Sequence, residues 1–139
     1  MGCDIHNYLE KRKGNEAWSN DKDGNIPLCR HYDFFTLLAG VRMYDDFKGQ
    51  YLEPKGFPND ACDEVKSHYY IDADFEEVDW DWHTPSWVTT QELEWVAEQH
   101  DKQYPHIGVN GCDFHELLQT MKKYEADGYE CRLVFWFDN

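Results

Sequence analysis

The chain has 139 residues, of which 41% are hydrophobic and 17% aromatic, and its formal net charge is -15. This length and composition predict one domain, residues 1–139, with enough apolar side chains for a core, and they exclude an intrinsically disordered chain. The charge disfavours duplex nucleic acid and anionic membranes as partners, and no apolar run reaches the ~18 residues of a membrane span. We therefore expect a cytoplasmic protein whose scattered cysteines are reduced.

The opening residues alternate in polarity, which predicts a strand from Cys3 to Glu10. Cys3 and Ile5 fall on the apolar face of this strand. Asp4 and His6 fall on its other face, where they are free to make polar contacts.

Turn and cap signals predict three short elements after the first strand. Residues Glu16–Asn20 are expected to return as the second strand of a hairpin, and Asp23-Gly24 predicts a further turn. Asp33 is expected to cap a short helix that Gly40 ends, and Asn59 is expected to cap another.

Two longer helices and a last strand are indicated in the second half of the chain. Thr89 and Glu92 form a capping box at the start of the first helix, and Asp113 and Glu116 form a second box. The last segment, YECRLVFWFDN, is apolar on both faces toward its end, so we expect a central strand that is covered on both sides.

Together these elements predict an α+β fold. We expect a small, mainly antiparallel sheet with about three to four helices packed on one side and with long ordered loops. The first and last strands are the most strongly indicated, and we treat them as candidate neighbours. Long ordered loops in a compact domain often build sites.

The spacing Asp-x-His occurs three times in the sequence. In the first instance Asp4 and His6 lie on one face of a predicted strand, so both side chains can bind one metal ion, one water or one ligand. If the last strand is a neighbour, Asp138 joins them, and two carboxylates with an imidazole suit a divalent metal ion. These three residues are the candidate catalytic and metal-binding set. The alternative is an ordinary acid–imidazole pair on a solvated face, beside an exposed terminus.

The segment DWDWHTPSW is expected to be a loop rich in tryptophan. Three indoles, those of Trp80, Trp82 and Trp87, are candidates to stack a nucleobase or a sugar. His83 and Ser86 lie beside them as further ligand-binding candidates. The alternative is a loop that its indoles pin onto the core.

Two arginines stand out in so acidic a chain. Arg30 and Arg42 are candidates for binding an anion or for a structural salt bridge, and both interpretations stay open. Tyr44 follows Arg42 closely and is a further ligand-binding candidate.

Four segments resemble a family of small proteins met in phages and bacteria: MGCDIH, YDFFTLLAGVR, HTPSWVTTQEL and VFWFDN. The resemblance spans most of the chain and implies a cytoplasmic protein, in the host cytoplasm if a phage encodes it. It implies a setting and not a mechanism. By analogy with other small phage proteins, we expect this protein to neutralise a nucleotide signal of bacterial immunity by binding it, with metal-assisted cleavage as a variant.

Two alternatives to this function stay open. One is a metal-dependent hydrolase, such as a phosphodiesterase, that acts on another small phosphorylated substrate through Asp4, His6 and Asp138 and a metal-bound water. The other is an acidic protein-interaction module or nucleic-acid mimic, which the six carboxylates from Asp72 to Asp81 favour. The expected partner is thus a small nucleotide, not a nucleic acid or a membrane, and the sequence leaves enzyme activity and a homo-oligomer undecided.

Overall fold

The computed structural model describes residues 2–21, 28, 30–103 and 114–139. Within these ranges the strands are β1 (Asp4–Arg12), β2 (Ser19–Asn20), β3 (Trp82–Thr89) and β4 (Glu130–Asp138). The helices are α1 (Tyr32–Ala39), α2 (Asp63–Tyr69), α3 (Thr90–Gln103) and α4 (Phe114–Ala126). The turn expected at Asp23-Gly24 and the cap expected at Asp113 lie outside the described residues. None of the helices described is long and apolar enough to cross a membrane.

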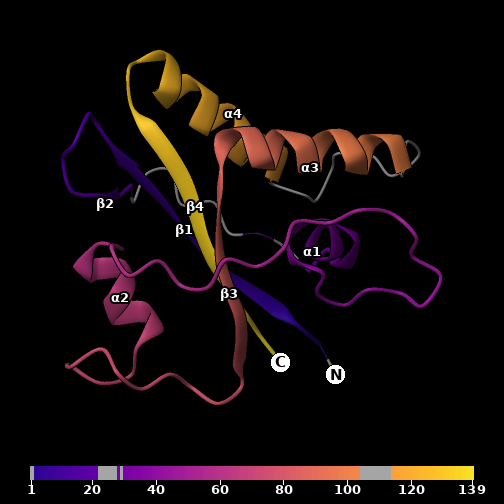
Figure 1. The fold of residues 1–139 in the computed structure, drawn as a ribbon, viewed down its shortest axis with the longest axis horizontal. Coiled ribbons are helices and arrows are strands. Elements are labelled where there is room, and N and C mark those ends of the chain that lie inside the picture. Colours follow the sequence, from indigo (N-terminus) through magenta and orange to yellow (C-terminus); the bar gives the residue numbers. More distant parts are fainter. Residues whose placement is uncertain (1, 22–27, 29, 104–113) are drawn as a thin grey trace.

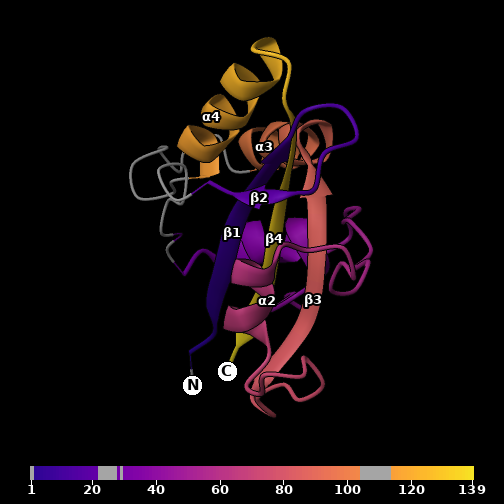
Figure 2. The ribbon, with the colours of Figure 1, turned by 90° about the vertical axis from the view of Figure 1, so that its left-hand side faces the viewer.

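In the described part of the chain the strands form one antiparallel sheet, in the order β2-β1-β4-β3 (Figure 1, Figure 2). β1 and β4 pair along their whole lengths, from Asp4 opposite Asp138 to Arg12 opposite Glu130. The first and last strands are therefore neighbours, and β4 has the central position that its apolar faces predict.

Helices cover both faces of the sheet. α1, α3 and α4 pack against the face that carries Leu133, Phe135 and Phe137, and this side holds the main hydrophobic core. α2 lies against the opposite face, where Val65 packs with Val134. Figure 1 shows α1 and α2 on opposite sides of the sheet. The α+β class and the antiparallel sheet are thus confirmed, with three of the described helices on one side and α2 on the other.

The start of α3 is set by hydrogen bonds within its own first turn, whereas the start of α1 depends on a contact with another helix. At α3 the predicted capping box forms, because the Thr89 N–H donates to Glu92 Oε1 (3.0 Å) and the Glu92 N–H donates to Thr89 Oγ1 (3.2 Å). At α1 the N-cap is His31, and Asp33 lies inside the first turn. His31 is held there by a contact with another helix, which no local pattern predicts. Gly40 ends α1 as expected, with a φ of 69°.

α2 begins after Cys62 and not after Asn59. The Cys62 N–H donates to Glu10 Oε2 (2.8 Å), so a carboxylate on β1 supplies an acceptor at the start of this helix. The helix therefore starts where it meets the sheet.

From Trp82 onward the tryptophan-rich segment is a strand, which corrects the expected loop there, whereas Trp80 lies in a turn before it. β3 pairs with β4 at the edge of the sheet, with a bulge between His83 and Ser86. Thr84 has a φ of 52° in this bulge, and Pro85 is tolerated because an edge strand can do without its N–H. The bulge breaks the alternation of polar and apolar residues that marks a strand in a sequence.

Candidate functional site

Polar side chains gather at one end of the sheet, where β1 and β3 begin and β4 ends. Asp138 lies opposite Asp4 on one side and opposite Trp82 on the other. Both ends of the described chain lie in this region (Figure 1). We call it the polar edge, and it comprises Asp4, His6, Trp82, His83, Asp138 and Asn139, with Arg30 beside Asp4.

His6 and Asp138 form an imidazole–carboxylate pair. His6 Nε2 lies 3.3 Å from Asp138 Oδ2, and the two side chains are 35% and 34% exposed. The imidazole lies beside the indoles of Trp82 and Trp136, with ring centroids 5.1 and 5.6 Å away. The indoles restrict the ring, and the exposed part of the pair can form hydrogen bonds with a ligand.

Asp4 has a different partner. Arg30 donates from Nε to Asp4 Oδ1 (2.5 Å) and from Nη2 to Oδ2 (3.1 Å), which is a bidentate ion pair on the exposed side of β1. The hydrogen bond from Arg30 is the largest influence on the pKa of the Asp4 carboxyl, which lies below its ordinary value. Arg30 thus forms the salt bridge that its sequence context allowed.

The expected metal set of Asp4, His6 and Asp138 is not assembled. Both Asp4 oxygens accept hydrogen bonds from Arg30, which leaves only two of the three side chains to share a ligand. Among the residues that the structure describes, no group of three His, Cys, Asp or Glu side chains is arranged to hold a metal ion. Zinc and calcium sites built from protein side chains take about three or more such ligands, which the polar edge in this arrangement does not supply.

The two ends of α1 bring arginines to the start of β1. Arg30 binds Asp4, and the Arg42 guanidinium lies over the ring of Tyr32, with Cζ 5.5 Å from the ring centroid. Tyr32 Oη in turn accepts the backbone N–H of Cys3 (3.0 Å). The guanidinium of Arg30 therefore lies at the polar edge, and that of Arg42 lies beside Tyr32 on the α1 side of the same end of the sheet, in a chain whose net charge is -15.

The other ligand candidates are spread over the molecule. His83 lies at the polar edge. Ser86 is buried, and its Oγ accepts the Lys55 N–H (2.9 Å). The Lys55 ammonium lies 3.8 Å from the ring centroid of Trp87, so Ser86 and Trp87 hold the segment before α2 against β3. Tyr44 is 59% exposed on the loop after α1.

Known proteins offer no guide to this arrangement. No family model, curated protein or solved structure matches the chain. The resemblance carried by four short segments therefore stays an expectation, and the function has to be inferred from the geometry of the polar edge.

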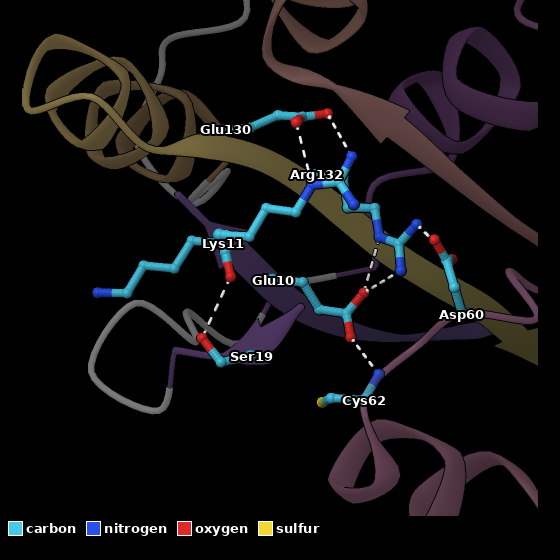
Figure 3. Close-up of polar contacts among 8 residues, drawn as sticks. Glu10, Lys11, Ser19, Asp60, Cys62, Glu130 and Arg132 are labelled. Carbon is cyan, nitrogen blue, oxygen red and sulfur yellow. Dashed lines mark hydrogen bonds and ion pairs between the residues drawn. The ribbon is translucent and has the colours of Figure 1, made fainter. Parts of the chain in front are cut away.

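A buried ionic network, which none of the predicted site residues indicated, lies on the α2 side of the sheet (Figure 3). Arg132 is 3% exposed, and it donates from Nε to Glu10 Oε1 (2.7 Å) and from Nη1 to Asp60 Oδ1 (2.9 Å). Glu10 is fully buried, and its other oxygen accepts the Cys62 N–H. The signal in the sequence is an arginine within an otherwise apolar strand, because a buried charge needs a partner.

Indoles and guanidinium groups stack beside this network. The Arg12 and Arg132 guanidiniums lie 4.3 and 4.1 Å from the Trp18 ring centroid, and Arg132 lies 5.7 Å from that of Trp87. A cavity of about 310 Å³ opens between these side chains. The charged side chains that line it are all ion-paired, so we interpret the network as an anchor of the fold and not as a ligand site.

Proposed function

We propose that the protein binds a small nucleotide at the polar edge and so neutralises it as a signal of bacterial immunity. The observation that carries this proposal is the His6–Asp138 pair beside two indoles, in the same region as the guanidinium groups at the two ends of α1. A nucleotide requires these three chemistries: hydrogen-bonding groups for the base or sugar, an aromatic surface, and positive charge for the phosphate.

Arg30 and Arg42 supply the phosphate subsite. Arg30 gives Nε and Nη2 to Asp4, and its side chain is 55% exposed, which leaves other guanidinium donors for a second acceptor. Arg42 stacks on Tyr32 and adds a second positive charge. Local guanidinium groups are needed because the net charge of the chain repels an anion at long range.

The aromatic and acidic side chains of the polar edge, together with Trp80, bind the base and the sugar. Trp80 is 90% exposed and precedes Trp82 by two residues, so it presents an indole face on which a base can stack. The Asp138 carboxylate accepts hydrogen bonds from amino or hydroxyl groups, and the His6 ring donates or accepts according to its tautomer.

Binding, and not cleavage, is the mode that this geometry favours. Metal-assisted cleavage and the alternative hydrolase both require Asp4 as a ligand, and Asp4 binds Arg30 instead. The role of Arg30 and Asp4 is then to shape and charge the site. A sequestering protein needs only affinity, which the polar edge can supply without a reaction step.

Thermal unfolding in the presence of cyclic nucleotides and ADP-ribose derivatives tests the proposal. A ligand at 100 times its Kd should stabilise the fold by about 2.7 kcal/mol, a rise in Tm of roughly 8 °C for a domain of this size. Sequestration further requires that heating the complex releases the nucleotide intact, which chromatography of the supernatant measures.

Variants locate the binding site. Arg30→Gln and His6→Ala should abolish the rise in Tm. Arg12→Gln is the matched control, because Arg12 forms a comparable ion pair with Glu130 (3.1 Å) at the opposite end of β1. A Tm that no nucleotide of the panel changes would contradict the proposal, and a chemically altered nucleotide after heating would show cleavage instead.

A second candidate function is an acidic protein-interaction module. Ile71 and Trp80 are 64% and 90% exposed within or beside the acidic segment from Asp72 to Asp81. The Asp72 side chain accepts two backbone N–H groups of this segment, at 3.0 and 2.8 Å, so the segment is ordered. This function predicts binding to a basic protein with a steep salt dependence and no response to nucleotides.

A further inference from the structure

Two histidines from different helices meet at the start of α1. His31 is the N-cap of α1 and His100 lies in α3, and their Nε2 atoms are 2.6 Å apart. Both rings also contact Phe114 of α4, with ring centroids 6.3 and 5.3 Å away. At this separation one nitrogen donates a hydrogen to the other, so the contact requires that one of the two facing nitrogens carries no proton.

The residues on either side of His31 are the ones that reach the start of β1. Arg30 forms the bidentate pair with Asp4, and Tyr32 Oη accepts the Cys3 N–H. Three consecutive residues thus tie the entrance of α1 to two different elements, β1 and α3. The contact between His31 and α3 fixes the middle residue and, through the backbone, the directions of the other two.

We propose that His31 and His100 are positioning residues, whose contact holds Arg30 and Tyr32 at the polar edge and is broken by acid. The neutral pair shares one hydrogen between its Nε2 atoms. One added proton leaves an imidazolium that donates to a neutral imidazole, so the contact survives it. Two added protons place two N–H groups and two positive charges against each other at 2.6 Å, so the rings must separate. The consequence for ligand binding rests on the proposed function, whereas the positioning itself does not.

The surroundings of the pair favour its neutral form. Burial is the largest influence on the pKa of both histidines and lowers both, and His100 lowers the pKa of His31 further. Asp33 of α1 and Asp101 of α3 act in the opposite direction, and Asp101 Oδ1 lies 3.7 Å from His100 Nδ1. His115 of α4, 3.1 Å from Asp101, lowers the pKa of His100. The pair is therefore neutral above the ordinary histidine pKa of 6.5 and takes up protons below it.

Hydrogen exchange at the Cys3 amide tests the positioning without any ligand. This amide donates to Tyr32 Oη, so its protection factor, corrected for the intrinsic exchange rate, reports whether the entrance of α1 is in place. We expect the protection to fall as the pH drops below about 6.5, by about tenfold per pH unit for each proton taken up on opening. His31→Gln should keep the protection at low pH, because its amide donates to neutral His100 through the N–H and, after the amide turns, accepts from protonated His100 through its oxygen.

His68→Gln is the matched control for this experiment. His68 stacks on Tyr8 from α2, at a ring-centroid distance of 4.9 Å, and its replacement should leave the pH dependence as in the wild type. Protection of the Cys3 amide that is unchanged by pH in the wild-type chain overturns the proposal, and this result needs no variant. The same holds if His31→Gln and the wild type lose protection together.

Binding of inorganic pyrophosphate tests whether the histidine pair affects the polar edge. It is followed through the NMR signal of the Arg30 Nε–H. Its affinity should fall more steeply with decreasing pH in the wild type than in His31→Gln, and this comparison cancels the titration of pyrophosphate itself. Equal pH dependences in the two chains overturn the link to Arg30. If pyrophosphate binds at no pH while Cys3 protection changes as expected, the proposed function fails and the positioning pair stands.

Discussion

Replacement of Arg132 by methionine tests whether the buried network stabilises the fold. Arg132→Met removes the ion pairs with Glu10 (2.7 Å) and Asp60 (2.9 Å) and keeps an apolar side chain that can pack against the indoles. The fully buried Glu10 carboxylate is then left without its cation. Breaking a buried pair in this way costs about 3–5 kcal/mol, which for a domain of this size lowers Tm by roughly 10–15 °C.

Arg12→Met is the matched control. Both guanidinium groups lie over Trp18, at 4.3 Å for Arg12 and 4.1 Å for Arg132. The partners in the Arg12–Glu130 pair, however, are 29% and 55% exposed, and such pairs contribute only about 0–1 kcal/mol. Urea unfolding followed by tryptophan fluorescence measures the free energy of unfolding of both variants.

Equal losses of stability in the two variants would refute this reasoning. They would show that the contact with Trp18, and not the burial of the ion pair, sets the contribution of each arginine. A double variant, Glu10→Gln with Arg132→Met, separates the two effects further. Because the introduced amide would be uncharged yet still able to accept the Cys62 N–H, the double variant should be more stable than Arg132→Met alone.

Stability should also fall in acid because of the histidine pair. The folded-state pKa values of His31 and His100 lie below 6.5, so the unfolded chain binds more protons below that pH and the free energy of unfolding declines there. Urea titrations of His31→Gln should show a smaller decline with falling pH than the wild type. An identical decline would contradict this. Thr89→Ala should cost about 1 kcal/mol, because α3 loses the hydroxyl that accepts a backbone N–H in its first turn; an unchanged urea midpoint would argue against the capping box. Gly40→Ala should lower Tm more than Gly14→Ala. Both positions have a positive φ, of 69° and 58°, but only at Gly40 does the added methyl meet a tyrosine ring, at 2.7 Å, so equal shifts would contradict the role of this contact.

Local signals predicted the elements that local contacts build. Thr89 and Glu92 exchange hydrogen bonds within a single turn, so their spacing alone placed the start of α3. The alternation along β1 likewise placed Asp4 and His6 on one face. The pairing of His6 with Asp138 followed from that alternation and from one further assumption, that the first and last strands are neighbours, which is confirmed.

Contacts between distant residues determined what the sequence left open. The start of α2 depends on Glu10, which is 52 residues from Cys62, and Asp4 binds Arg30, which is 26 residues away. Neither separation leaves a pattern in the sequence. β3 escaped prediction for another reason: the bulge at Thr84 shifts the alternation, so the segment resembles a loop although its residues from Trp82 onward belong to a strand that pairs with β4.

The pairing of β1 with β4 also brings the two ends of the described chain side by side, with Asp4 opposite Asp138 (Figure 1, Figure 2). A purification tag on either end would therefore crowd the side chains that we propose bind the ligand. A circular permutant can therefore be used to block the polar edge without changing the fold. Joining the two ends with a short linker and opening the chain at Gly14, where an added methyl meets no atom within 4 Å, keeps the central strands paired while it covers the polar edge. One protein would then keep the fold and lose the site.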